Sequence, residues 1–149
     1  MEEVIRAKGT VRVSLRNVLT GEIVESHDYN LIVSVGKTIL AKLLGGDAAY
    51  AGLEHISKIA FGTGSTAAAT TDTALESEQL AKDVTVSYPA FNKVMFAATM
   101  GADEGGSLTY QEMGLKSDAT GILFSRIVIN PIAKSTLYEI DIEWTISFQ

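Results

Sequence analysis

A group of three residues that follows an apolar run is of the types that end a nucleotide-binding loop. Gly36, Lys37 and Thr38 occupy the order in which a P-loop places its final glycine, its phosphate-binding lysine and its Mg²⁺-binding hydroxyl. That loop needs a second glycine five residues earlier, so that backbone N–H groups can surround the phosphates, and Leu31 holds this position. We therefore expect an ordinary helix N-terminus with a solvated lysine, and no nucleotide site.

Two glycines after a short apolar strand form a second pattern with chemical potential. Gly62 and Gly64, in the sequence Gly62-Thr63-Gly64-Ser65, resemble the start of a dinucleotide-binding loop. The third glycine of that loop is missing, and no βαβ unit follows that would supply an acid for the ribose. Because paired glycines at a strand end more often form a tight turn or a bulge, we expect no cofactor here.

The spacing of the residues does not indicate a metal site or a hydrolase active site. His27 and His55 are the only two histidines, neither has a companion at metal-ligand spacing, and the chain contains no cysteine. The stretch 103–106, Asp-Glu-Gly-Gly, lacks the alternating acids of a calcium loop and is typical of a turn. No Gly-x-Ser-x-Gly sequence provides a strained nucleophile. The sequence therefore predicts no metal, no cofactor and no enzymatic activity.

One row of acids is the candidate contact surface. Glu139, Asp141 and Glu143 alternate with apolar residues in the segment 138–148, so they share one face of a strand. Their default role is to keep that face soluble, although a basic partner surface or a bound cation would relieve their repulsion. We predict them as candidate assembly-contact residues, and we interpret Trp144 on the opposite face as a core anchor.

The elements that carry these residues are mostly strands, with one helix. Apolar residues from Val35 to Leu44 share one helical face, which predicts an amphipathic helix over about 34–44 with Ser34 as its N-cap and Gly45-Gly46 at its end. Alternating or short apolar runs between turn residues predict strands. The expected strands are 10–16, 23–29, 56–61, 84–88, 93–99, 122–129 and 138–148, with a weaker candidate at 108–115.

Two connections complete the expected fold. The stretch 47–54 is predicted to be a loop, and the Ala- and Thr-rich stretch 66–78 is predicted to be exposed and the most mobile region, with one helical turn near 73–79. Short strands at this spacing predict a single domain, 1–149, that is mainly β: an antiparallel β-sandwich, or a barrel-like variant, with one amphipathic helix.

Composition limits the classes of partner. The 149 residues, 46% of them hydrophobic, are enough for one buried core. The net charge is −6 and the basic residues are scattered, which argues against nucleic acid as a partner. No apolar run approaches the roughly 20 residues of a membrane-spanning helix, and the charged start 1–6 is unlike a signal peptide. We expect a soluble protein synthesised in the cytoplasm.

Several stretches, taken in order, resemble one group of proteins. They are Asn30–Val33 leading through Gly36 into Leu40–Leu44, then Ile59–Gly64 with Asp72–Leu75, then Glu112–Leu115, Gly121–Arg126 and Ile140–Ile146. This series is similar to small virion proteins of tailed bacteriophages, of the type described as tail-fibre, tail-collar or neck-associated structural proteins. The likeness spans about residues 30–149, and the order of the stretches carries it.

The resemblance implies a β-rich assembly protein with no catalytic residues. It would be present in many copies as a symmetric trimer or ring, together with other virion proteins of the neck or tail, and would reach the virion after synthesis in the host cytoplasm. Because a long repetitive shaft and a large distal domain are lacking, a collar, neck, tail-accessory or fibre-anchoring role is favoured over host recognition.

Two other functions remain open at this stage. One is a head-decoration or cement protein, and the other is a module that binds a host polysaccharide. In each assembly role, the first hairpin and the last strand, 138–148, are the expected places for pairing between copies.

Overall fold

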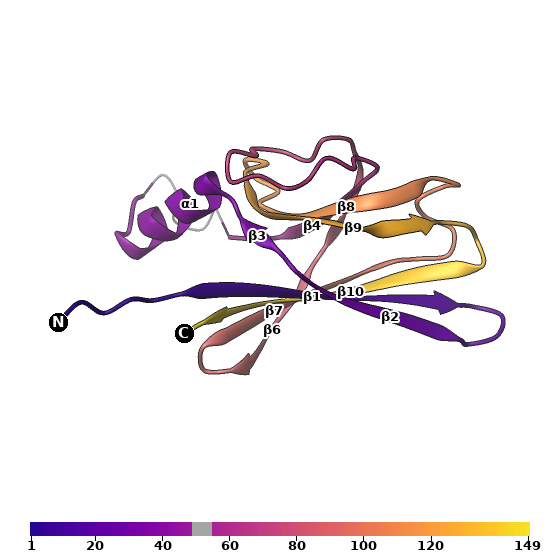
Figure 1. The fold of residues 1–149 in the computed structure, drawn as a ribbon, viewed down its shortest axis with the longest axis horizontal. Helices are drawn as coiled ribbons and strands as arrows, with labels where there is room; N and C mark the ends of the chain where they lie inside the picture. Colours follow the sequence, from indigo (N-terminus) through magenta and orange to yellow (C-terminus); the bar gives the residue numbers. More distant parts are fainter. Residues whose placement is uncertain (49–54) are drawn as a thin grey trace.

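The strands from the two ends of the chain lie side by side in one sheet. The computed structural model describes residues 1–48 and 55–149, and ten strands within these ranges form two five-stranded antiparallel sheets (Figure 1). Sheet A has the order β2-β1-β10-β7-β6. Its strands are β1 (Ala7–Asn17), β2 (Ile23–Tyr29), β6 (Thr85–Ala90), β7 (Lys93–Met100) and β10 (Tyr138–Phe148).

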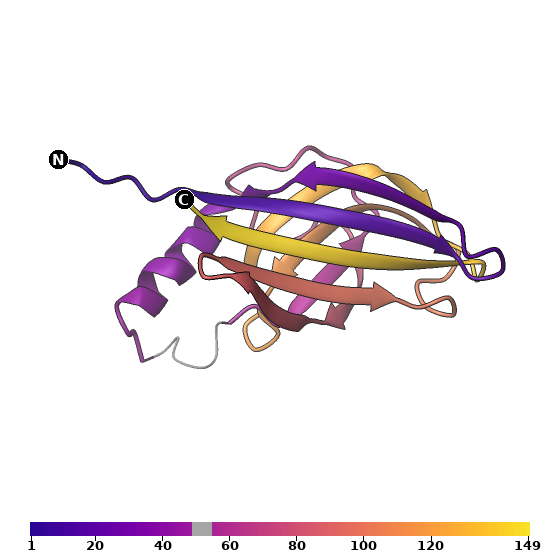
Figure 2. The same cartoon turned by 90° about the horizontal axis from the view of Figure 1, so that it is seen from below.

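Sheet B stacks against sheet A and carries the helix beside it. Its order is β3-β9-β8-β4-β5, so β8 is the middle strand and β5 lies at one edge. Its strands are β3 (Leu31–Ile32), β4 (Lys58–Gly62), β5 (Glu78–Asp83), β8 (Thr109–Lys116) and β9 (Leu123–Ala133). The helix α1 (Ser34–Leu44) lies at the end of the sandwich where the chain termini are found (Figures 1 and 2).

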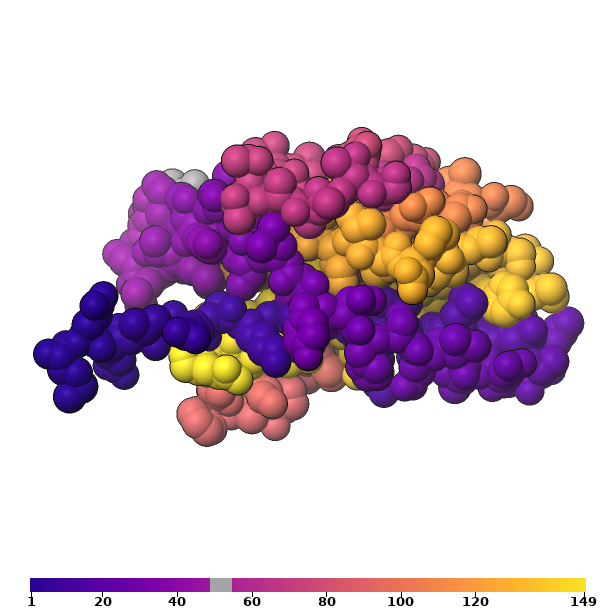
Figure 3. Space-filling view, in the orientation of Figure 1, coloured from indigo at the N-terminus to yellow at the C-terminus, as the bar shows by residue number. Residues whose placement is uncertain are grey.

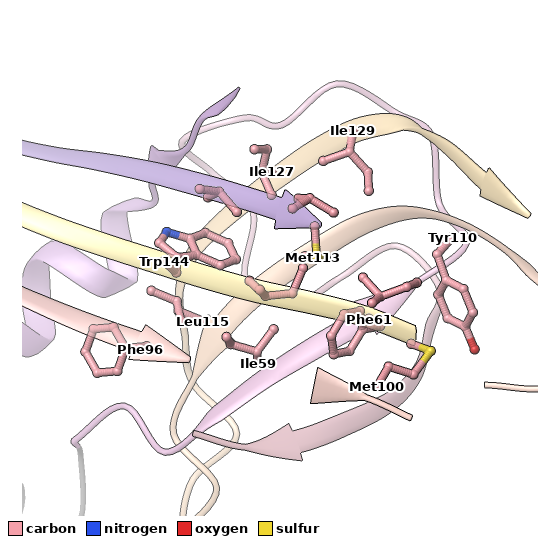
Figure 4. Close-up of a cluster of buried hydrophobic side chains, with 14 of the residues drawn as sticks. Ile59, Phe61, Phe96, Met100, Tyr110, Met113, Leu115, Ile127, Ile129 and Trp144 are labelled. Carbon is pink, nitrogen blue, oxygen red and sulfur yellow. The ribbon is translucent and has the colours of Figure 1, made fainter. Parts of the chain in front are cut away.

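The core fills the space between the two sheets. In β10 the alternating residues Ile140, Ile142, Trp144 and Ile146 are all buried, so one face of this strand is entirely apolar and faces sheet B (Figure 4). One cluster of buried hydrophobic side chains spans both sheets, and it includes an edge-to-face contact between Phe61 and Tyr110 with a ring-centroid distance of 6.3 Å. The period-two pattern of the sequence therefore becomes the core face of the sandwich.

The helix occupies the predicted residues but begins differently. Val33 is the N-cap, and no side chain caps the helix, so the prediction of Ser34 as N-cap is wrong. The reason lies in tertiary hydrogen bonds: the N–H of Val33 donates to the carbonyl of Phe124 (3.2 Å), and the N–H of Ser34 donates to the carbonyl of Thr70 (2.8 Å). These contacts fix where the chain turns from β3 into the helix.

The predicted fold class is confirmed, with local corrections. Over residues 1–48 and 55–149 the structure is mainly β with two antiparallel sheets and one helix, and the sheets of these ranges are not closed into a barrel. The short strands β3 and β5 were not predicted. The helical turn expected near 73–79 is absent, because β5 begins at Glu78 and pairs with β4. Of the loop expected at 47–54, residues 49–54 lie outside the described residues.

Candidate interaction surface

The acidic row of β10 is matched by basic residues of β1. Antiparallel pairing places Glu143 opposite Arg12 and Glu139 opposite Arg16, and both couples form ion pairs. The hydroxyl of Thr99 on β7 donates a hydrogen bond to Asp141 (2.5 Å). The repulsion within the row is therefore relieved inside the chain, so the row requires neither a partner nor a bound cation for this purpose.

The position of β10 in sheet A changes one expectation about assembly. Both edges of β10 are hydrogen-bonded within the chain, to β1 on one side and to β7 on the other. The expectation that the last strand pairs with another copy is therefore wrong for its backbone edges, and only its charged face is available. The outer edge of β2, in the first hairpin, has no neighbouring strand among the described residues. An unpaired edge of this kind can accept a strand from another chain.

Gly62 at the end of β4 and Gly64 just after it make room for a buried carboxylate. The side chain of Glu112 on β8 is 0% exposed and accepts hydrogen bonds from the backbone N–H groups of Gly64 (3.1 Å), Glu76 (3.0 Å) and Ser77 (2.7 Å). A Cβ at position 64 would lie 2.6 Å from a carboxylate oxygen of Glu112, and one at position 62 would lie closer still. The glycine pattern that resembled a dinucleotide loop therefore serves packing around a carboxylate of the protein itself.

Arg126 neutralises this carboxylate and extends the network. It lies on β9, is 2% exposed, and donates from Nε to Glu112 (3.0 Å). Its terminal nitrogens donate to the carboxylate of Asp72 (3.0 Å) and to the carbonyl of Thr66 (2.9 Å). We call Glu112, Arg126 and these loop partners the clamp, because they fasten residues 63–77 to the outer face of sheet B.

The stretch 66–78 is largely exposed, as predicted, but the clamp attaches it to sheet B, which argues against a loose connection. Glu76 accepts hydrogen bonds from the N–H and the hydroxyl of Thr66, both at 2.9 Å, and these bonds lower the pKa of Glu76 below its ordinary value. Leu75 approaches sheet B so closely that a Cβ on Gly114 would lie 3.0 Å from it. The stretch 66–78 is thus attached to the sheet at several points. The charged groups of the clamp make their hydrogen bonds to this stretch.

The P-loop-like residues also have structural explanations. A Cβ at Gly36 would overlap the carbonyl oxygen of Phe124, so a glycine lets α1 approach β9. The hydroxyl of Thr38 donates to the carbonyl of Ser34 within the helix (3.2 Å), and Lys37 is exposed to solvent, as expected of a helix N-terminus.

The remaining candidate residues are dispersed. His27 is exposed on β2, whereas His55 lies beside α1. In the turn 103–106, Glu104 accepts hydrogen bonds from Lys82 (2.5 Å) and from the N–H of Gly101 (2.8 Å). Within residues 1–48 and 55–149, no three His, Asp or Glu side chains are grouped to hold a metal ion. In the same ranges, no helix has the length and apolar character to cross a membrane.

An apolar groove between α1 and the β6–β7 hairpin was missed by the sequence analysis. It has a volume of about 610 Å³, and its lining comes from α1 (Leu40, Leu43), β7 (Val94, Phe96) and the end of β10 (Phe148), among others. The ionisable lining residues are Lys93, His55 and Tyr88, and no acid lines the groove among the described residues. The sequence signal for this groove was the pair of aromatic residues Tyr88, in β6, and Phe91, in the β6–β7 turn.

Several exposed apolar side chains lie at the same end of the molecule as the groove. Phe91 at the hairpin tip and Leu44 at the end of α1 are almost fully exposed. Residues 1–6, which we call the arm, extend past the sandwich beside the C-terminus, and Val4 and Ile5 are exposed on it (Figures 1 and 3). Exposed apolar side chains of this kind are typical of a protein–protein contact.

A scan of protein-family models and searches of curated proteins and of solved structures gave no match to this chain.

Proposed function

We propose that this protein is a non-enzymatic structural subunit of a tailed-phage virion, located at the neck, collar or tail. It assembles there with copies of itself and with neighbouring virion proteins. The observation that carries the proposal is the apolar surface at one end of the sandwich, made by the groove, Phe91, Leu44 and the arm. Such a surface is unfavourable on an isolated protein and is stabilised when a partner covers it.

The stretches behind the phage resemblance come together in the fold. Residues from four of them, including Gly64, Asp72, Glu112 and Arg126, meet in the clamp. Gly36, from another stretch, packs against Phe124. The series of stretches thus corresponds to a set of long-range contacts that build the fold.

Imaging of the virion tests the location. We expect cryo-electron microscopy of particles with and without the gene to differ by density at the neck, collar or tail, into which this sandwich fits. Loss of knobs on the capsid surface would instead identify a head-decoration protein. Absence of the protein from purified particles would contradict both structural roles.

A polysaccharide-binding module is the second candidate, favoured by one observation. Tyr88 and Phe91 are exposed beside the groove, and aromatic faces of this kind stack on sugar rings. Glycan-array binding by the wild type, abolished in Tyr88→Ala and Phe91→Ala and retained in Leu19→Ala at the opposite end, would favour this candidate. If binding is absent at micromolar concentrations, the candidate is excluded.

A further inference from the structure

We propose that the arm of one copy binds in the apolar groove of a second copy. The inference deepens the proposed function, because it rests on the idea that copies of the chain assemble through this end and names the contact that joins them. It does not depend on where the assembly sits in the particle.

The arm has apolar side chains without contacts of their own. Beyond Arg6, which exchanges two backbone hydrogen bonds with Gln149 (2.7 and 2.8 Å), no hydrogen bond or ion pair in the described structure involves residues 1–5. Val4 and Ile5 are nonetheless among the most exposed apolar residues of the chain. An extended apolar segment that lacks a surface to cover it is suited to insertion into another chain.

The groove and the arm are complementary in chemistry. The described residues of the groove give it an apolar floor with Lys93 and His55 and no acid, whereas the arm has Glu2 and Glu3 next to its apolar pair. Neighbouring residues of an extended segment point in opposite directions, so only one of Val4 and Ile5 enters the groove. The acid two residues before it, Glu2 or Glu3, lies on the same face and can approach Lys93. Five extended residues span roughly 17 Å.

The direction of the arm favours the groove of another copy over its own. The pair Arg6–Gln149 continues the antiparallel alignment of β1 and β10, so the arm leaves in line with β1 and away from the body (Figures 2 and 3). To enter its own groove it would have to reverse next to Arg6, yet residues 1–6 contain no Gly, Pro, Asn or Asp. The β-branched Val4 and Ile5 favour an extended conformation at that point.

The location of both features predicts a closed assembly. The arm and the groove lie at the same end of the sandwich, so two or more copies that meet at this end can each give an arm and receive one (Figure 2). Such reciprocal exchange closes around a rotation axis and produces a dimer, a trimer or a small ring rather than an open filament.

Cross-linking through introduced cysteines tests the contact directly, because the natural chain has none. We expect a Val4→Cys copy mixed with a Phe91→Cys copy to form a disulfide-linked heterodimer under mild oxidation. A Leu19→Cys copy mixed with the same Phe91→Cys copy is the matched control, since Leu19 is equally accessible but lies in the β1–β2 turn. If the control pair cross-links as well as the test pair, or the test pair does not cross-link, the inference is wrong.

Sedimentation equilibrium provides the second measurement. We expect the double variant Val4→Asp, Ile5→Asp and the single variant Phe91→Asp each to raise the dissociation constant at least 10-fold, and Leu19→Asp to leave it unchanged. All four positions are exposed, so circular dichroism should show an intact fold. A monomeric wild type, or an oligomer that the arm variants do not weaken, would overturn the inference. If the arm variants do not weaken the oligomer, the copies assemble through a different interface and the proposed function still holds. If the protein is absent from purified particles, the proposed function is wrong, whatever its oligomeric state in solution.

Discussion

Glu112 and Arg126 form a charged pair in a position where charges are costly. Their burial removes both groups from water, and a buried pair is tolerated only when further hydrogen bonds satisfy its remaining donors and acceptors. Here three backbone N–H groups, a carboxylate and a carbonyl supply those bonds. The pair therefore holds the connection 63–77 in one geometry, and each partner depends on the other.

Replacing Glu112 by Gln should destabilise the protein strongly. The amide would bring an NH₂ group against N–H donors and leave the guanidinium of Arg126 without its buried counter-charge. We expect a loss of about 3–5 kcal/mol in the free energy of unfolding, measured by urea denaturation.

The matched control for this change is a surface ion pair. Glu143→Gln breaks the pair with Arg12, where both side chains are about 40% exposed, and should cost less than about 1 kcal/mol. Equal losses for Glu112→Gln and Glu143→Gln would contradict the role we assign to the clamp.

At the scale of single elements, the helix α1 is held by its contact with β9 more than by its own sequence. It has no side-chain N-cap and no acid in its first turn. Among its residues only Gly36 and Ile39 are buried, and the first of these approaches the backbone of Phe124. Tertiary packing of one face commonly determines whether a helix of this length forms.

Gly36→Ala should destabilise the protein, against the usual effect of this substitution. In an open helix, alanine is more favourable than glycine by about 1 kcal/mol. A Cβ at this position would overlap the carbonyl oxygen of Phe124, so α1 must move off β9, and we expect a net loss of about 1–3 kcal/mol.

Gly45→Ala provides the comparison at the other end of the helix. Gly45 has an ordinary φ of −78°, and a Cβ added there would lie 3.5 Å from the carbonyl oxygen of Ala41, which is an ordinary contact distance. Alanine there should be neutral or stabilise by about 0.4–1 kcal/mol in thermal or urea unfolding. Stabilisation by both substitutions would show that α1 does not depend on its close approach to β9.

At the scale of the whole molecule, the order of the strands sets which parts open first. The strands β10 and β8 lie in the middle of their sheets, with partners on both sides, whereas β2 lies at an edge and its residues are largely exposed. Local opening is easiest where few apolar contacts oppose it.

Hydrogen exchange should therefore differ by orders of magnitude between these strands. We expect the amides of β10 and β8 to exchange only through global unfolding, and the outward amides of β2 to exchange within the dead time of a manual experiment. Mass spectrometry or NMR exchange at neutral pH measures the difference. Equal protection of β2 would mean that its edge is covered in solution, which would point to a second contact between copies.

The sequence determined the local elements by itself. The alternation in 138–148 and the helical spacing in 34–44 predicted β10 and α1 with the observed bounds, because the period of apolar residues is a local property that each element must satisfy to bury one face. The antiparallel sandwich followed from the number and spacing of such strands. The short β3 and the polar β5 have no such period and were missed.

Only the tertiary structure decided which side chains meet. Arg16 and Glu139 are 123 residues apart, and the pairing of β1 with β10 that joins them has no local signal. Glu112 on β8 and Arg126 on β9 are both visible in the sequence, but a charge in a strand is ordinarily solvated, so nothing local marks them as a buried pair. Burial, and the gathering of the arm, α1 and the β6–β7 hairpin at one end, depend on strand order, which long-range packing fixes rather than any single stretch of chain.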